Sequence, residues 1–182
     1  MQNIYETERL FLKTLGPSDA EAVADYYRRN RSFLEEFEPG RGDEFYTAEH
    51  QAKLLATDSA EMADGTMFRL WLLKKGDGKL IGSLAFNNIV RGPFLSCFVG
   101  YKLDGDEINR GFMTEALRKG IDIMFRESGL HRIEANIMPG NRRSLRVVEK
   151  LGFSNEGLAR RYLKINGKWE DHIHMVLLND AV

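Results

Sequence analysis

The chain has 182 residues, of which 43% are hydrophobic and 29% are charged, and its formal net charge is −1. This length and composition are typical of one globular domain with a substantial core, here residues 1–182. The near-zero charge predicts no direct nucleic-acid partner and no attraction to a membrane surface. A single cysteine excludes an internal disulfide, and no cluster of cysteine and histidine indicates a metal site. The charged N-terminal segment predicts neither a signal peptide nor a membrane span, so we expect a cytoplasmic protein.

The N-terminal third predicts one strand and three helical segments. Residues 8–15 alternate as a strand does, and Gly16-Pro17-Ser18 then opens a helix with an apolar face. The acidic and aromatic residues 33–45 are interpreted as a short helix followed by a surface loop. Thr47 is the expected N-cap of a further helix. The apolar face of the first helix consists of Ala20, Val23, Ala24 and Tyr27.

The remainder alternates strands with two well-marked helices. Residues 66–75, 80–89 and 94–103 predict an antiparallel meander. A helix over 110–129, a strand over 131–138 and a helix from Asn141 to Gly152 come next, and a hairpin turns at Asn166-Gly167. The order predicts a single α+β domain with a mixed sheet, in which a β-α-β unit places two strands parallel and side by side.

The start of the long helix is a candidate anion site. The first N–H groups of a helix have no internal partner, and the helix dipole favours negative charge there. Gly111 lets a phosphate approach the backbone, Arg110 adds a charge, and the Thr114 hydroxyl reaches the same place. An ordinary helix start gives the same pattern. The Walker and Rossmann glycine motifs are both absent.

The start of the next helix carries a second candidate. Asn141 is a good N-cap, but Ser144 stands at the N3 position, where the reciprocal partner is usually Glu or Gln. Its hydroxyl is therefore free to bond elsewhere, although a solvated first-turn serine fits equally well. Both helices follow strands expected to be parallel neighbours, so their N-termini open at one sheet edge. One would bind a pyrophosphate and the other would present Asn and Ser to a reacting group.

Other reactive residue types favour structural interpretations. Cys97 stands in an apolar strand, which is typical of a buried, inert thiol. His172 and His174 alternate on one strand beside Asp171, but no third metal ligand is placed, so we expect no metal. Tyr162 suits packing as well as proton donation, and Glu115 complements a helix dipole.

Several stretches resemble one known family over nearly the whole chain. The sequence is similar to the GNAT N-acetyltransferases, and within them to the RimJ/RimL group, which acetylates protein N-termini, with the RimJ type most similar. The stretches that carry the resemblance, in chain order, are ADYYRRNRSFLEEFEP, NNIVRG, CFVGY, RGFMTEAL, HRIEANIMPGNRRS and LGFSNEGLARRYLKINGKWEDH.

The resemblance implies the GNAT fold: a mostly antiparallel mixed sheet of about seven strands, about four flanking helices and a splayed parallel strand pair. It also implies acetyl-CoA as co-substrate and no metal. Ser144 would protonate the departing thiolate as general acid, and Asn141 would bind pantetheine or a water. The implied cofactor-binding residues are Val99, Gly100, Tyr101, Arg110, Gly111, Phe112, Met113, Thr114, Asn136, Asn141 and Ser144.

Two departures from the family pattern concern affinity and the base. Ile108 stands where the pyrophosphate loop usually has Gln or Arg, which predicts weaker cofactor binding. Phe98 and Val99 replace a Glu that many relatives carry near this strand's Gly-Tyr, so no general base is evident. Since an α-amine has a pKa of about 7.7–8.0 against about 10.4 for lysine, the missing carboxylate favours an α-amine acceptor.

The acceptor site is expected at the acidic loop and a strand edge. Glu38 is the best carboxylate for holding or deprotonating a cationic N-terminus, although a loop charge is usually just solvated. Asn87, Asn88 and Arg91 are candidates to hold peptide carbonyls. No activated Cys or Ser-His pair is present, which favours direct attack in a ternary complex.

Three functions stay open from the sequence. The first is acetylation of the N-terminal α-amine of a protein, ribosomal proteins being the expected substrates. The second is acetylation of a small amine such as an amino acid or antibiotic, and the third is a non-catalytic CoA-binding module. The chain is expected to act as a monomer or a homodimer.

Overall fold

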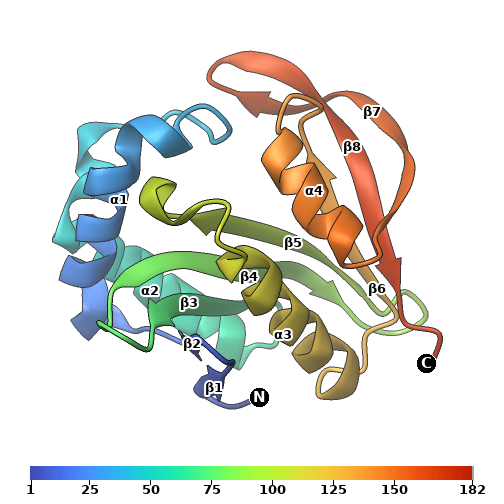
Figure 1. Ribbon diagram of the computed structural model, residues 1–182, viewed down its shortest axis with the longest axis horizontal. Helices are drawn as coiled ribbons and strands as arrows, with labels where there is room; N and C mark the ends of the chain where they lie inside the picture. Colours follow the sequence, from blue (N-terminus) through green and yellow to red (C-terminus); the bar gives the residue numbers. More distant parts are fainter. Residues whose placement is uncertain (182) are drawn as a thin grey trace.

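The computed structural model describes residues 1–181. Within them lies an eight-stranded sheet with the strand order β1-β2-β3-β4-β5-β6-β8-β7 (Figure 1). The strands are β1 Ile4–Glu6, β2 Leu10–Lys13, β3 Phe68–Lys74, β4 Leu80–Val90, β5 Ser96–Leu103, β6 Arg132–Ile137, β7 Ser154–Ile165 and β8 Lys168–Leu178. The α-helices are α1 Ala20–Leu34, α2 Ala48–Ala63, α3 Phe112–Arg126 and α4 Arg142–Lys150, and short 3-10 turns lie at Pro17–Asp19, Asp43–Tyr46 and Gly105–Glu107.

The sheet is antiparallel except at one place. Strands β3 to β5 form the expected meander, which β2 and β1 extend, and β6, β8 and β7 form a second antiparallel group. Helix α3 crosses over between β5 and β6, which pair in parallel. The predicted GNAT fold with a parallel pair is confirmed. The eighth strand is β1, whose three residues are too few to show an alternating pattern but pair with β2 from Ile4 opposite Lys13.

The helices differ from the expectation at one point. The separate short helix expected from residue 33 is instead the last turn of α1, which runs unbroken from Ala20 to Leu34. No Pro or Gly interrupts this segment before Pro39, so the helix continues to Leu34. The predicted cap of α2 is confirmed, because the Thr47 hydroxyl accepts a bond from the His50 N–H at 3.2 Å.

Helices cover both faces of the sheet (Figure 1). On one face, α3 and α4 pack through Leu117, Met124 and Val148, each fully buried, in the larger core cluster. On the other face, α1 and α2 enclose Trp71 of β3 in a separate, aromatic cluster with Tyr26 and Tyr27. No helix among the described residues is long and apolar enough to cross a bilayer.

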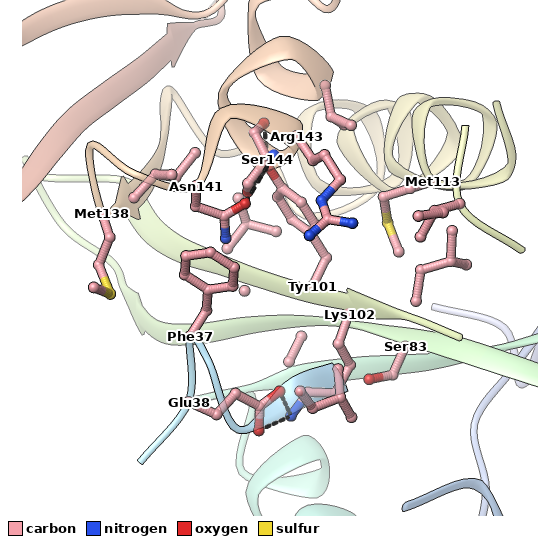
Figure 2. Close-up of a pocket in the computed structure, with 18 of the residues that line it drawn as sticks. Phe37, Glu38, Ser83, Tyr101, Lys102, Met113, Met138, Asn141, Arg143 and Ser144 are labelled. Carbon is pink, nitrogen blue, oxygen red and sulfur yellow. Dashed lines mark hydrogen bonds and ion pairs between the residues drawn. The ribbon is translucent and has the colours of Figure 1, made fainter. Parts of the chain in front are cut away.

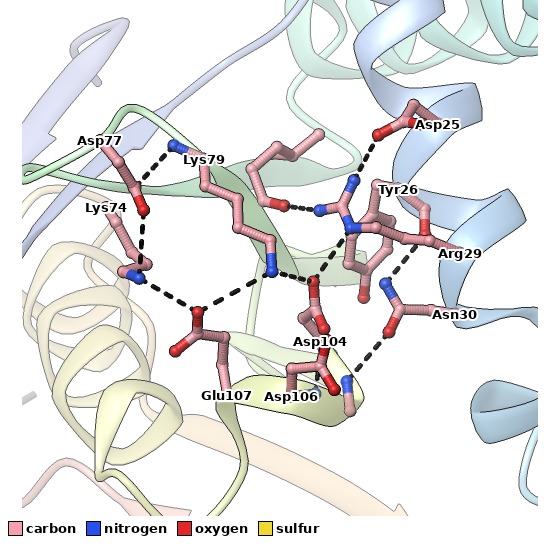
Figure 3. A network of polar contacts seen from close by, with 12 residues as sticks. Asp25, Tyr26, Arg29, Asn30, Lys74, Asp77, Lys79, Asp104, Asp106 and Glu107 are labelled. Atoms are coloured by element: carbon pink, nitrogen blue, oxygen red, sulfur yellow. Dashed lines mark hydrogen bonds and ion pairs between the residues drawn. The ribbon is translucent and has the colours of Figure 1, made fainter.

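A buried polar network holds the loop that leads into α3 (Figure 3). Asp104, 1% exposed, accepts from Arg29 of α1 and Lys79 of the β3–β4 turn, each at 3.1 Å. Burial alone would raise the pKa of Asp104, but the Asp106 N–H and the two cations lower it below its ordinary value. Glu107 pairs with Lys74 at 3.1 Å. Because both carboxylates are fixed, the backbone approaching Gly111 is held in place.

Candidate active site

The parallel strands β5 and β6 separate soon after they meet. They pair only from Ser96–Arg132 to Phe98–Glu134, after which β5 continues to Leu103 and β6 to Ile137 without pairing with each other. A cleft of about 580 Å³ occupies this gap. Side chains alternate along a strand, so Tyr101 faces α3 and α4 while Lys102 faces α1, and the cleft is open to both faces of the sheet (Figure 2).

One wall of the cleft is the N-terminus of α3. Gly111 caps this helix with φ 82°, a left-handed conformation that favours glycine. Arg9 of the neighbouring segment braces the turn: its guanidinium donates to the Arg110 carbonyl at 2.9 Å and covers the Phe112 ring at 4.4 Å. The first-turn N–H groups of α3 have no partner within the helix, and Gly111, Met113 and Thr114 beside them line the cleft, which suits an anion site.

The opposite wall is the N-terminus of α4. The Asn141 side chain accepts from the Ser144 N–H at 3.1 Å, which is the predicted cap. The Ser144 hydroxyl has a protein partner: it donates to the Tyr101 hydroxyl at 2.7 Å, and Tyr101 donates in turn to the Ser144 carbonyl at 3.0 Å (Figure 2). Burial raises the pKa of Tyr101 above its ordinary value, although the bond from Ser144 partly opposes this, so the phenol stays protonated. The hydroxyl groups of Tyr101 on β5 and Ser144 on α4 therefore lie together in the cleft, where β5 and β6 no longer pair.

The face toward α1 is lined by charged side chains. Glu38, after α1, pairs with Lys102 of β5 at 2.8 Å (Figure 2). Burial opposes the charge of Lys102, but the Tyr27 ring beside it and Glu38 outweigh this and raise its pKa. Arg69 of β3 also lines the cleft and pairs with Asp58 of α2 at 3.0 Å. Burial raises the pKa of Asp58 in spite of Arg69.

The structure brings most of the predicted site residues to this one cleft. Those that line it are Glu38, Asn87, Val99, Gly100, Tyr101, Gly111, Met113, Thr114, Asn136, Asn141 and Ser144. The residues predicted to bind the cofactor or acceptor that do not line it are Asn88, Arg91, Arg110 and Phe112.

Each of these four side chains is engaged or directed elsewhere. Arg91 bonds to the Ser128 hydroxyl at 2.8 Å, near the far end of α3, so the structure gives it no place at the acceptor. Asn88 is exposed on an irregular part of β4 with φ 51°. The guanidinium of Arg110 pairs with Glu107 at 3.0 Å, and the Phe112 ring is buried under Arg9, so neither side chain is directed into the cleft.

Comparison with known proteins identifies the family. Residues 9–154 match the acetyltransferase (GNAT) domain. The chain belongs to the GNAT acetyltransferase family. It is 39% identical over 168 residues to the ribosomal protein uS5-alanine N-acetyltransferase of Escherichia coli, an alignment that covers 92% of this chain and 86% of that enzyme.

Solved structures of relatives support the same family assignment. The ribosomal-protein-S5-alanine acetyltransferase from Vibrio fischeri superposes with a TM-score of 0.93 at 37% identity, covering 98% of both chains. RimJ of Mycobacterium smegmatis, solved in complex with CoA-disulfide, superposes with a TM-score of 0.89 at 29% identity, covering 95% of this chain and 83% of that one. The sequence-based assignment to GNAT enzymes of the RimJ/RimL type is thereby confirmed.

Sequence reasoning missed a row of cations in this GNAT cleft. Arg143, Arg146 and Lys150 of α4 all line it, across from the α3 N-terminus. Their spacing of three and four residues places them on one side of the helix, a signal visible in the sequence. An open gap, free helix amides and three cations fit a long anionic donor such as CoA.

Cys97 and Glu115 take structural roles. Burial raises the pKa of Cys97 to about 12, so the thiol is inert at neutral pH. Glu115 pairs with Arg9 at 2.6 Å; burial would raise its pKa, but hydrogen bonds from Thr7 and Arg9 lower it. Among residues 1–181 no group of three His, Cys, Asp or Glu side chains is placed to hold a metal ion.

Proposed function

We propose that this GNAT acetyltransferase moves the acetyl group of acetyl-CoA to the N-terminal α-amine of a protein, a ribosomal protein being the leading candidate, by direct attack in a ternary complex. The observation that carries the proposal is the cleft between β5 and β6, which reaches both faces of the sheet. A donor on the α3–α4 side and an acceptor on the α1 side would meet in the gap.

The residues on the α3–α4 side suit the donor. The α3 amides at Gly111 and the cations of α4 provide for its phosphates, and the unpaired backbone beyond Phe98 provides for its amide-containing arm. Acetyl-CoA supplies an activated acyl group and a thiolate that leaves. In the structure both hydroxyl hydrogens are donated within the Ser144–Tyr101 pair, so the Ser144 hydroxyl would turn from Tyr101 to that sulfur, donate a hydrogen bond to it and then a proton.

The opposite side suits a chain end. Glu38 provides a carboxylate close to the gap for a cationic amine, although Lys102 partly neutralises it. The Asn166 amide of the β7–β8 turn donates to the Glu35 carbonyl at 2.7 Å, which joins that turn to the segment after α1. An extended N-terminus enters between joined segments more easily than a lysine on a folded surface. The relatives that acetylate an alanine of ribosomal protein uS5 support the same acceptor class.

The test is release of CoA from acetyl-CoA with peptides that begin with Ala, Ser or Met, and with an N-terminally blocked peptide that carries free lysines. A thiol reagent at pH 8 detects the product, because the buried Cys97 does not react. We expect turnover with the free N-termini and none with the blocked control. Turnover with the blocked peptide alone, or only with small amines, would overturn the α-amine assignment, and binding of CoA without turnover of any amine would point to a non-catalytic module.

A further inference from the structure

His172 lines the cleft and alternates along β8 with Ile173, which packs on the α3–α4 core, so the histidine side chain faces the acceptor side. The reaction must remove a proton from the acceptor ammonium before its nitrogen can attack, and the sequence offered no evident base. Glu38 is a poor choice, because Lys102 holds both of its oxygens at 2.8 Å. His172 of β8 also lines the cleft, with its side chain largely buried.

The hydrogen bond of His172 fixes which ring nitrogen is free. Nδ1 lies 3.0 Å from the Glu170 carbonyl oxygen, which only accepts, so Nδ1 carries the hydrogen and Nε2 carries the lone pair. Nε2 has no protein partner among residues 1–181, yet it is not one of the fully enclosed polar atoms. His174 differs: its Nε2 is fully enclosed without a partner, and it does not line the cleft.

The surroundings of His172 leave its imidazole without an ion pair in the described part of the chain. Tyr162 of β7 lies against it, with ring centroids 5.7 Å apart, and also contacts His174 at 5.0 Å. On β6, Glu134 faces His174 at 3.7 Å and pairs with Arg132. Across the cleft, Glu38 and Lys102 are paired with each other, and Arg69 is paired with Asp58. The lone pair of Nε2 is therefore available to the acceptor.

We infer that His172 is the proton acceptor of the reaction, through one water between Nε2 and the acceptor ammonium; this rests on the proposed function. Nε2 takes one ammonium proton, and the freed nitrogen lone pair forms the C–N bond as the C–S bond breaks. The second nitrogen proton passes to the Ser144–Tyr101 pair and replaces the proton that this pair gives to the departing sulfur. The imidazolium returns its proton to solvent.

The kinetic test compares His172→Gln with the matched control His174→Gln on the same strand. At pH 7 we expect kcat/KM of His172→Gln to fall about 100-fold. At pH 9.5 most of the peptide α-amine is neutral and needs no base, so this deficit should shrink about tenfold. His174→Gln should stay within about threefold of the parent at both pH values. A loss under threefold for His172→Gln, a deficit that does not change with pH, or an equal loss in His174→Gln would overturn the inference.

Two further measurements separate this inference from the proposed function. If the parent enzyme turns over only small amines, the α-amine assignment fails. The ratio of kcat/KM between the parent and His172→Gln, measured with such an amine at low and high pH, still decides the role of His172. Nitrogen-15 NMR of the imidazoles, with the His172 signal assigned by its loss in His172→Gln, is independent of turnover. We expect the hydrogen on Nδ1, and a hydrogen on Nε2 of the neutral ring would overturn the inference.

Discussion

The two sides of the β5–β6 gap are built in different ways. The side toward α3 and α4 consists of helix N-termini, their caps and unpaired strand backbone, all within residues 97–150. The side toward α1 consists of side-chain contacts between distant parts of the chain: Glu38 with Lys102, 64 residues apart, and Asn166 with Glu35, 131 residues apart. Local sequence signals therefore describe the first side, while only tertiary structure assembles the second.

Ser144→Ala gives the largest effect expected from the local side. It removes the hydroxyl that bonds Tyr101 and that, in the proposed reaction, protonates the leaving sulfur, so kcat should fall about 100-fold with CoA affinity unchanged within about twofold. Steady-state rates and calorimetry with CoA measure the two quantities. Tyr101→Phe is the companion variant and should show a smaller loss of kcat. Equal losses of affinity and rate in Ser144→Ala would mean that this residue positions the donor instead.

The paired substitution Arg146→Ala and Lys150→Ala should weaken CoA binding about tenfold, or about 1.4 kcal/mol, by removing two cations from the cleft. Added salt should reduce the difference in CoA affinity between the parent and the double variant, because salt screens exposed charges. Arg142→Ala is the control, since Arg142 is exposed on the same helix but does not line the cleft. A similar loss of CoA affinity in Arg142→Ala would show that the effect comes from the overall charge of the surface and not from cations in the cleft.

Glu38→Gln tests the assembled side. It should raise KM for the peptide about threefold to fivefold and leave CoA affinity unchanged. A change of this size is expected for the loss of one partly exposed charge contact. Glu36→Gln, in the same segment but exposed and without an ion pair in the described chain, should leave both constants as they are. A change in CoA affinity with Glu38→Gln would show that the two sides are not separable.

Asn166→Ala has the smallest expected effect. Losing one bond between the β7–β8 turn and Glu35 should raise the rate on an N-terminally blocked lysine peptide about twofold relative to a free N-terminus, by loosening the entrance. Competition between the two peptides, read by mass spectrometry, measures the ratio. An unchanged ratio would mean that the bond between Asn166 and Glu35 does not affect the choice between the two peptides.

The sequence predicted the order of elements, the parallel pair and the caps at Thr47 and Asn141, because periodicity and capping are properties of adjacent residues. It did not predict β1, which is too short to show a period, or the ion pair that occupies Glu38. It placed Arg91 at the acceptor as a residue of the strand edge, but β4 is irregular at this end and Arg91 bonds to Ser128 instead. The tautomer of His172 depends on a carbonyl position, which no residue pattern reveals.

Arg9 braces the turn before α3, so a residue near the start of the chain supports the wall of the cleft at Gly111. This one side chain bonds the Arg110 carbonyl and pairs with Glu115, although it lies about a hundred residues earlier in the sequence. Truncating the first nine residues, or attaching a bulky tag against them, would leave the meander largely intact while releasing the turn at Gly111. Expression designs for this enzyme are therefore better fused at the C-terminal end.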